Sequence, residues 1–451
     1  MRTLNLAQES EKSLVARLAL PAMAGQLVNV LYSIVDRVYI GHLPSGGDIA
    51  LGAIGIAAPL ITLLSSPAYL VGVGGAPIMM MRLGAGKKDD AQKILNNAFI
   101  MLLFFGIIIP LICLAFLKQI LLLIGATPSV LPLSESYMQI YLIGSVFAII
   151  GTGLAQFITA QGFSDVSMIS MCLGAFINVV LDPIFIFKFN MGIRGAAIAT
   201  AIAQCASCIL NLLFMFGTRS RLSIKLDKPD FNCIGKIALY GFSPFLIYMT
   251  DSIVIIAINS ALKRAAGINA DQCISAYTIC CSLIQLVTMP LLGISGGTGG
   301  LLSYNYGAGN AERVKRSEKI IFVWGLAFTS LCFLLSIFFS RFMCSLFTPD
   351  EALIDLASHY LKISIAPIVL LSTQYVFVDG LTALGFPVQA SLLSFNRKLV
   401  MIGSTFVLPA FFGPVGAVYA SALGDICGPI VSTIVFLIIF PKILRKCEKA
   451  A

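Results

Sequence analysis

The chain is poor in the residues that build metal and redox centres. Only 2 of its 451 residues are histidine, and 11% are charged. Its 12 cysteines lie mostly inside apolar segments, where cysteine acts as a small hydrophobic side chain. Cys205 and Cys208 have CxxC spacing, but no second such pair completes a four-cysteine site. We therefore expect no metal centre, no redox site and no bound cofactor.

A phosphate-binding loop is also missing. The glycine-rich stretch from Gly84 to Asp89 reads GAGKKD and does not fit the GxxxxGK[ST] pattern that cradles nucleotide phosphates. This excludes an ATP-driven pump, and we expect that the protein is not an enzyme. The stretch itself is typical of a tight turn with solvated lysines.

Apolar residues dominate what is present. They make up 58% of the chain, and the mean hydropathy is +0.94. Since a membrane-spanning helix needs about 20 apolar residues, the pattern predicts an all-α integral membrane protein with twelve transmembrane helices. The expected spans lie near 14–41, 49–82, 94–117, 132–160, 166–189, 193–217, 234–262, 272–304, 318–340, 353–384, 389–412 and 416–440.

The sequence repeats itself at an offset of 223 residues. The matching landmarks are Pro21 and Pro244, Pro67 and Pro290, the GAG turns at 84–86 and 307–309, Tyr137 and Tyr360, Gly162 and Gly385, and, after a two-residue gap, Gly192 and Gly413. We infer an N-lobe at 1–217 with helices 1–6, a cytoplasmic linker at 218–233 and a C-lobe at 234–451 with helices 7–12. Because each lobe has an even number of helices, the two bundles should be related by a pseudo-two-fold axis along the membrane normal.

The net charge of +9 is unevenly distributed along the chain. With the N-terminus inside, 22 of the 30 basic residues, Arg397 and Lys398 among them, fall on the cytoplasmic side. This positive-inside bias places both termini in the cytoplasm and favours a multi-pass protein of the plasma membrane over a partner of nucleic acid.

Ionisable residues inside the spans need a reason, because a charge at the bilayer centre costs on the order of 3 kcal/mol. We expect no glutamate there and five deep aspartates, which are Asp36, Asp182, Asp251, Asp379 and Asp425. By helix rise, Asp36, Asp182 and Thr200 lie at a common depth, about 8 to 10 Å below the outer helix ends.

The candidate cation-coupling residues are Asp36, Asn178, Asp182 and Thr200. Asn178 and Asp182 are four residues apart and share a helix face. Pro183 removes a backbone N–H and so leaves the carbonyl of Val179 without its usual donor. These oxygens suit a proton or a hard cation such as Na⁺. The alternative is a purely structural cluster that holds three helices together.

The second lobe does not copy this cluster. At the repeat offset, Asn259, Met401 and Thr405 replace Asp36, Asn178 and Asp182. The cation site should therefore be confined to the first lobe. Candidate substrate-cleft acids in the second lobe are Asp251, Asp425 and Asp379, and for Asp379 a packing role is the alternative. Pro21 is a candidate bend in helix 1, either static or moving.

The chain resembles the multidrug and toxic compound extrusion (MATE) transporters over about 14–440. The resemblance is carried by twelve helices in two repeats, PAMAGQ from Pro21, VDR around Asp36, the GAG turns, NVVLDP from Asn178 and GIRGAA from Gly192. It implies that Asp36, Asn178, Asp182 and Thr200 form the N-lobe cation site, with Na⁺ a candidate at the first three, and that helix 1 bends at Pro21. Acidic coupling residues known in the C-lobe of other members are not reproduced at Asn259.

The activity implied is export of amphipathic, drug-like organic cations by antiport with H⁺ or Na⁺. We expect a monomer in the lipid bilayer. The alternative is a lipid-linked oligosaccharide flippase of the same superfamily, which needs basic residues in its central cleft. The deep charges found in the sequence are aspartates, which disfavours that alternative. Neither the coupling ion nor the range of substrates follows from the sequence.

Overall fold

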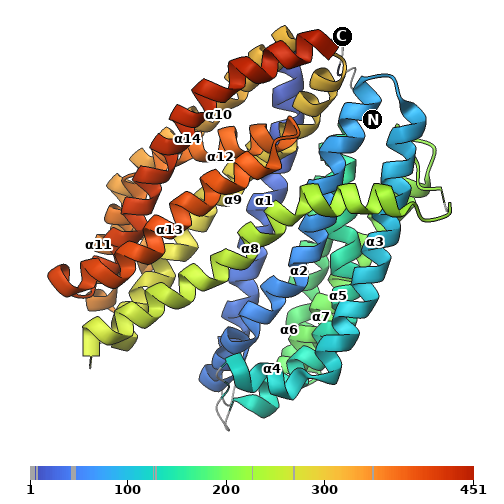
Figure 1. Cartoon of the computed structure of the whole chain (residues 1–451). Helices are drawn as coiled ribbons and strands as arrows, with labels where there is room; N and C mark the ends of the chain where they lie inside the picture. The colour runs from blue at the N-terminus through green and yellow to red at the C-terminus, as the bar shows by residue number, and fades with distance from the viewer. Residues whose placement is uncertain are drawn as a thin grey trace. The chain divides into compact units, whose positions relative to one another are not determined.

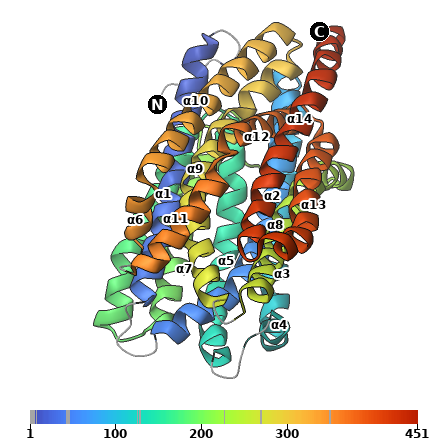
Figure 2. The same cartoon turned by 90° about the vertical axis from the view of Figure 1, so that its left-hand side faces the viewer.

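The computed structural model describes residues 6, 9–41, 47–124, 126, 130–225, 227–267, 270–347 and 350–450. Every regular element in these ranges is a helix (Figure 1). The elements are α1 (Glu11–Gly41), α2 (Gly47–Gly84), α3 (Lys88–Ala115), α4 (Leu117–Ile124), α5 (Leu131–Ala160), α6 (Ser164–Pro183), the π-helix η1 (Ile184–Lys188), α7 (Ile193–Phe216), α8 (Phe231–Ala266), α9 (Ala270–Gly307), α10 (Ala311–Ser345), α11 (Glu351–Ile365), α12 (Ile368–Ala383), α13 (Pro387–Phe412) and α14 (Val415–Ala450). The view in Figure 2 likewise shows helices throughout.

The all-α membrane fold is confirmed. Ten helices of the described ranges are long and apolar enough to cross a membrane. The span expected near 353–384 is instead a broken one, because α11 and α12 meet at an angle of 50°. Pro367 is the residue before α12, and its ring and missing N–H end the preceding helix. The span expected near 389–412 corresponds to α13, which is 26 residues long but is not one of these ten helices.

Large apolar side chains cover much of the outside of these helices. Leu213 of α7 is 70% exposed and Phe338 of α10 is 77% exposed, and both helices are long and apolar. In water such side chains would favour aggregation, whereas lipid solvates them. The exposed apolar surface therefore agrees with a multi-pass membrane protein.

Two helices are shared between two compact units. Of the described residues, unit 1 comprises those in 24–248, and unit 2 comprises those in 6–23 and 249–450. The first part of α1, blue in Figure 1, therefore packs in unit 2, and the first part of α8, yellow-green, packs in unit 1. The lobes at 1–217 and 234–451 describe the duplication and stay a prediction. Each packed unit contains the first half of one helix, α1 or α8, whose second half belongs to the other unit.

Glycines let these half-helices pack closely. In unit 1, a Cβ on Gly241 of α8 would lie 1.8 Å from the carbonyl oxygen of Leu70 in α2, and one on Gly74 would lie 2.5 Å from the Cα of Gly241. In unit 2, a Cβ on Gly297 of α9 would lie 3.3 Å from the carbonyl oxygen of Leu18 in α1. Gly297 and Leu18 are the repeat equivalents of Gly74 and Gly241. The exchange therefore follows the duplication.

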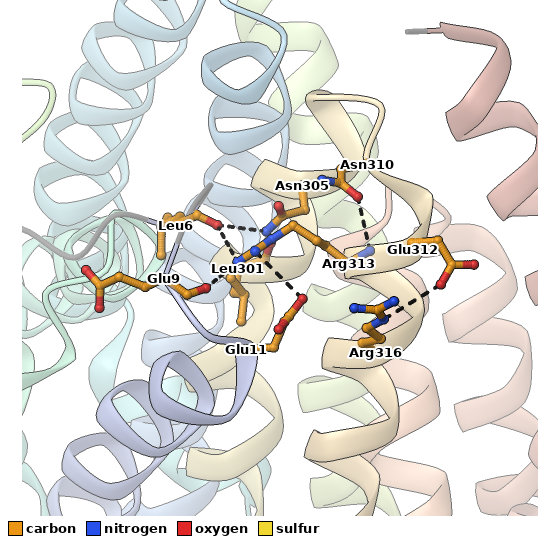
Figure 3. Close-up of polar contacts among 9 residues, drawn as sticks. All are labelled: Leu6, Glu9, Glu11, Leu301, Asn305, Asn310, Glu312, Arg313 and Arg316. Atoms are coloured by element: carbon orange, nitrogen blue, oxygen red, sulfur yellow. Dashed lines mark hydrogen bonds and ion pairs between the residues drawn. The ribbon is translucent and has the colours of Figure 1, made fainter.

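The chain just before α1 is also held in unit 2 (Figure 3). The Arg313 guanidinium donates to the carbonyl oxygens of Glu9 at 2.7 Å and Leu6 at 3.5 Å. Asn305 Nδ2 donates to the same Leu6 oxygen at 3.2 Å, and Glu11 pairs with Arg313 at 3.7 Å. Leu6 is fully buried. These contacts fix the start of α1 against α9 and α10.

The linker before α8 is held in unit 1 in a comparable way. The backbone N–H of Leu222 donates to Gln161 Oε1 at 2.9 Å, and that of Lys225 donates to Asn96 Oδ1 at 3.0 Å. Asp230 donates its N–H to Asn97 Oδ1 at 2.7 Å. Each unit thus binds the segment that leads into its borrowed half-helix.

Three charged residues lie elsewhere than the sequence suggested. Glu318 is a buried residue of α10, inside one of the membrane-crossing helices, so the expectation of glutamate-free spans is wrong. Arg397 and Lys398 lie in the middle of α13 and not in a cytoplasmic loop. Both residues also lie inside the span expected at 389–412, so counting them on the cytoplasmic side conflicted with that span. The positive-inside bias remains without these two residues.

Candidate functional site

The four candidate coupling residues come together within unit 1. Asn178 and Asp182 lie one turn apart on α6, and both are buried. Asn178 Nδ2 donates to Asp182 Oδ1 at 3.2 Å and is also 3.3 Å from Thr200 Oγ1 on α7. The i, i+4 spacing explains the first contact, and the packing of α6 on α7 brings in the second.

Asp36 of α1 completes the cluster. Its carboxyl group lies close enough to the Asp182 carboxyl group for the two to interact electrostatically. Two carboxylates at such a distance repel each other unless a proton or a cation lies between them. Asp36 belongs to the part of α1 that packs in unit 1, whereas Pro21 belongs to the part that packs in unit 2. Helix α1 runs through Pro21 as a single element, and a bend there stays a prediction.

Proline shapes the backbone beside the acids. Pro183 is the last residue of α6, and the π-helix η1 follows directly. A π-helix widens the turn by one residue, and such segments are frequent at functional sites. Gly195 of α7 packs on this turn, because a Cβ there would lie 2.7 Å from the carbonyl carbon of Phe185. The close contact fixes α7, and Thr200 with it, near Asp182.

Three tyrosines were missed from the sequence. Tyr32, Tyr137 and Tyr141 all lie close enough to Asp36 to interact with it electrostatically. Tyr137 and Tyr141 of α5 stack with ring centroids 5.9 Å apart. A usable signal was the spacing, since Tyr32 lies one helical turn before Asp36 and Tyr137 lies one turn before Tyr141. Phenol groups can donate to carboxylate oxygens, so they supply polar surroundings for a charged state of the site.

Acceptor oxygens are in excess over donors in the cluster. Within the described ranges, Asn178 Oδ1 and Asp182 Oδ2 are buried and have no hydrogen-bond donor. Buried acceptors without a partner cost free energy, which a bound proton or cation can recover. The described residues contain no group of three or more His, Cys, Asp or Glu side chains around one point. The donor set fits a proton or a monovalent cation better than a transition metal.

The candidate substrate-cleft acids in unit 2 have partners. Asp425 of α14 forms an ion pair with Arg397 at 2.7 Å. Asp251 of α8, whose side chain is 54% exposed, forms one with Lys398 at 2.8 Å. Asp379 of α12 accepts a hydrogen bond from Ser295 of α9. Two of these acids are therefore neutralised by bases, and a role for them in substrate binding stays a prediction.

Arg397 fits because a glycine faces it. Gly428 of α14 lies so close that a Cβ there would be 2.7 Å from the Arg397 Cβ. In unit 1 the equivalent contact is reversed, with Gly174 on α6 facing Ser207 on α7. In unit 1 the glycine of this contact is on the first helix of the pair, and in unit 2 it is on the second. The missing side chain of Gly428 leaves room for the buried Arg397 in unit 2.

Comparison with known proteins supports the same organisation. The family model MatE matches residues 21–184 and again 245–407. The chain belongs to the MatE family. Both matches cover most of one repeat, and the second ends 223 residues after the first, at the offset of the sequence landmarks. The MatE matches therefore confirm the duplication, and they include Asp36, Asn178 and Asp182 in the first copy.

Relatives of this MatE protein cover nearly its whole length. The multidrug export protein MepA of Staphylococcus aureus (strain N315) is 27% identical over 423 residues, which are 93% of this chain and 92% of that protein. MepA of Staphylococcus haemolyticus (strain JCSC1435) is 27% identical over 421 residues, with the same coverage.

Solved structures share the fold. One is described as the outward-facing conformation of a multidrug resistance MATE family transporter of the MOP superfamily, and it has a TM-score of 0.91 at 22% identity, covering 98% of this chain and 99% of that one. Another, from Pyrococcus furiosus Vc1 (DSM3638), has a TM-score of 0.90 at 22% identity with the same coverage. Its description states that a reversed polarity of the binding pocket suggests a different function. At this identity, the likeness establishes the fold.

Proposed function

We propose that this MatE protein is a secondary active transporter, not an enzyme, that exports amphipathic organic cations in antiport with H⁺ or Na⁺. The observation that carries the proposal is the buried polar cluster of Asn178, Asp182 and Thr200, with Asp36 near enough to interact with Asp182, inside apolar helices of unit 1. The relatives named multidrug export protein support drug-like substrates.

The cation site supplies the driving force in this proposal. When the site is empty of cations, repulsion between Asp36 and Asp182 favours their separation, and a bound proton or Na⁺ removes that repulsion. Asn178 Oδ1 and Thr200 Oγ1 are further oxygens that can accept a hydrogen bond or coordinate the cation. Since α1 carries Asp36 in unit 1 and Pro21 in unit 2, binding at the acids acts on a helix common to both units. A change at Pro21 is the conformational step that we infer.

The setting of the transporter completes the proposal. We place it in the plasma membrane with both termini in the cytoplasm, as the basic residues of the even-numbered loops favour. We infer that it works as a monomer, with drug-like small molecules and lipid as its only partners and without nucleic acid. Accessibility of introduced cysteines to a membrane-impermeant thiol reagent would test the orientation.

The decisive experiment is export of ethidium by purified protein in liposomes with separately imposed H⁺ and Na⁺ gradients. Asp36→Asn and Asp182→Asn should lose gradient-driven transport while inserting normally. Asp165→Asn is the matched control, because Asp165 lies on the same helix α6 but outside the cluster, where it binds the N–H of Val166. Wild-type export by Asp36→Asn refutes the site, and a failure of both gradients to drive wild-type export refutes antiport.

The flippase alternative requires basic residues deep in the protein, and two are present. Arg397 and Lys398 are deep basic residues, so their supposed absence cannot exclude it. Each is instead paired with an acid, Asp425 and Asp251, which leaves little positive charge for a pyrophosphate group. The names of the relatives also favour drug export. Export of ethidium by the wild-type protein separates the two functions, because a flippase should be indifferent to the dye.

A further inference from the structure

The last turns of α14 extend past the apolar part of that helix. With 36 residues, α14 is about 54 Å long, whereas the hydrocarbon core of a bilayer is about 30 Å thick. Its apolar run ends at Phe440, and Lys442, Arg445 and Lys446 follow. These three basic residues therefore come at the level of the lipid headgroups, near the C-terminus marked in Figure 1.

One face of this end of α14 is packed against unit 2. Ile443 and Cys447 are each 1% exposed, and the Cys447 thiol donates to the carbonyl oxygen of Tyr306 at 3.4 Å. Lys446 Nζ lies over the ring of Phe386, 5.9 Å from its centroid. The last turns are thus docked on unit 2, and this defines where the basic side chains start.

Another face of α14 is exposed and changes from apolar to basic. Ile434 and Ile438 are 54% and 57% exposed, and the exposed residues Lys442 and Arg445 continue the same face toward the helix end. A phospholipid has the same order of chemistry, with apolar acyl chains below a charged headgroup. We call Lys442, Arg445 and Lys446 the basic stripe.

The basic stripe has no acidic partner in the protein. Within the described ranges, none of its three residues forms an ion pair. Exposed arginines elsewhere in unit 2 do form such pairs, since Arg316 is 3.8 Å from Glu312 and Arg341 is 3.1 Å from Asp355. The positive-inside bias accounts for basic residues at this end, but it does not require them to lack acids.

Unit 1 covers the equivalent surface with its own chain. At the offset of 221 that holds after the two-residue gap, the basic stripe corresponds to Arg221, Ile224 and Lys225 of the linker. Ile224 is 5% exposed and donates its backbone N–H to the carbonyl oxygen of Met215 at 2.9 Å. The N–H of Lys225 donates to Asn96. The exposed basic stripe is therefore specific to unit 2.

We propose that the basic stripe binds the headgroups of anionic phospholipids, with their acyl chains along Ile434 and Ile438. The phosphate oxygens accept hydrogen bonds from Arg445 and the two lysines, and the net negative charge of the headgroup balances the stripe. A lipid without net charge cannot supply that balance. In the proposed orientation these lipids belong to the cytoplasmic leaflet. Lipid binding goes beyond the proposed antiport and does not depend on it.

Quenching of tryptophan fluorescence by brominated lipids measures lipid preference at a chosen position. Since Trp324 is the only tryptophan in the sequence, Trp324→Phe gives a background without tryptophan. Ile434→Trp then reports on lipid below the basic stripe. Leu213→Trp is its matched control, because Leu213 is the repeat equivalent in unit 1 and is 70% exposed. The bilayers contain phosphatidylglycerol and phosphatidylcholine, one of which carries brominated acyl chains.

The reporter at position 434 should prefer phosphatidylglycerol to phosphatidylcholine by at least about fivefold, the factor that one basic residue near the membrane surface supplies. The preference at position 213 should be smaller. Replacing all three residues of the basic stripe by glutamine should remove the preference at 434. Lys315→Gln with Lys319→Gln should leave it unchanged, because these exposed lysines belong to α10.

Equal preferences at positions 434 and 213 would reveal a general effect of surface charge and overturn the proposal. A preference at 434 that survives the loss of all three bases would do the same. Thermal unfolding in detergent is an independent measurement, in which added phosphatidylglycerol should raise the Tm of the wild type but not that of the triple variant. Equal Tm increases in the two proteins would contradict binding at the stripe. Failure of the liposome transport assay would refute the antiport alone.

Discussion

Removing the guanidinium of Arg313 should loosen the start of helix α1. In Arg313→Ala, the carbonyl oxygens of Glu9 and Leu6 lose the donors found at 2.7 and 3.5 Å (Figure 3). A hydrogen bond from a charged group contributes about 1.5 to 3 kcal/mol, and the longer contact is at the limit of a hydrogen bond. The ion pair with Glu11, at 3.7 Å and with side chains 15% and 18% exposed, adds about 1 kcal/mol at most.

The docking of this segment should therefore weaken by about 2 to 4 kcal/mol. With 1.4 kcal/mol for each factor of ten, local opening becomes more frequent by about 30-fold to several hundred-fold. Hydrogen exchange followed by mass spectrometry measures this increase in peptides from the first turns of α1. Arg313→Lys should give an intermediate value, because an ammonium group keeps the charge but cannot copy the fork of donors.

Arg316→Ala is the matched control for this experiment. Arg316 is on the same helix and pairs with Glu312 at 3.8 Å, but both side chains are 67% exposed. Such an i, i+4 pair contributes about 0.3 to 0.5 kcal/mol, so exchange at the start of α1 should change less than about threefold. Equal exchange rates in the two variants would refute the view that Arg313 holds the chain before α1.

Three further predictions concern stability, measured as thermal unfolding in detergent with a thiol-reactive dye, since several of the 12 free cysteines are buried. Gly241→Ala should destabilise unit 1 by several kcal/mol, because its Cβ would lie 1.8 Å from a backbone oxygen, whereas Gly235→Ala on the same helix, with nothing within 4 Å, should stabilise it by up to about 1 kcal/mol. Asp425→Asn should cost about 3 to 5 kcal/mol by leaving Arg397 buried without its acid, and replacing both residues by leucine or methionine should recover most of that loss. Asp350→Ala should cost about 1 kcal/mol, because the Asp350 carboxylate caps α11 by accepting two backbone N–H groups.

The sequence predicted the parts of the site that obey a helical period. Asn178 and Asp182 were placed together by their spacing, and Asp36 and Thr200 joined them because helix rise put all of them near one depth. The break between α11 and α12 was not foreseen, although Pro367 marks it. A proline shows that a helix can break, but only packing decides whether two segments diverge by 50°.

The spacing of residues along the sequence could not predict charged side chains whose burial depends on partners in other helices. Glu318 was counted out of the membrane because it stands at the edge of an apolar run, and its burial comes from Gly380, 62 positions later in the sequence. Arg397 was mistaken for a loop residue for a similar reason, since Asp425 and Gly428 of another helix accommodate it. Long-range neutralisation of this kind leaves no local pattern.

The two exchanged half-helices make each lobe incomplete by itself. A chain severed in the linker would yield fragments that each begin with a segment packing in the other's unit, 6–23 or 234–248. A solitary C-terminal fragment would leave the glycine groove at Gly293 and Gly297 without the α1 segment that fills it. We expect co-expressed fragments to associate by exchanging these helical segments, as two subunits do in a domain-swapped dimer. Fusion of the duplicated copies would then have turned a symmetric swap between two subunits into a covalent feature of one polypeptide.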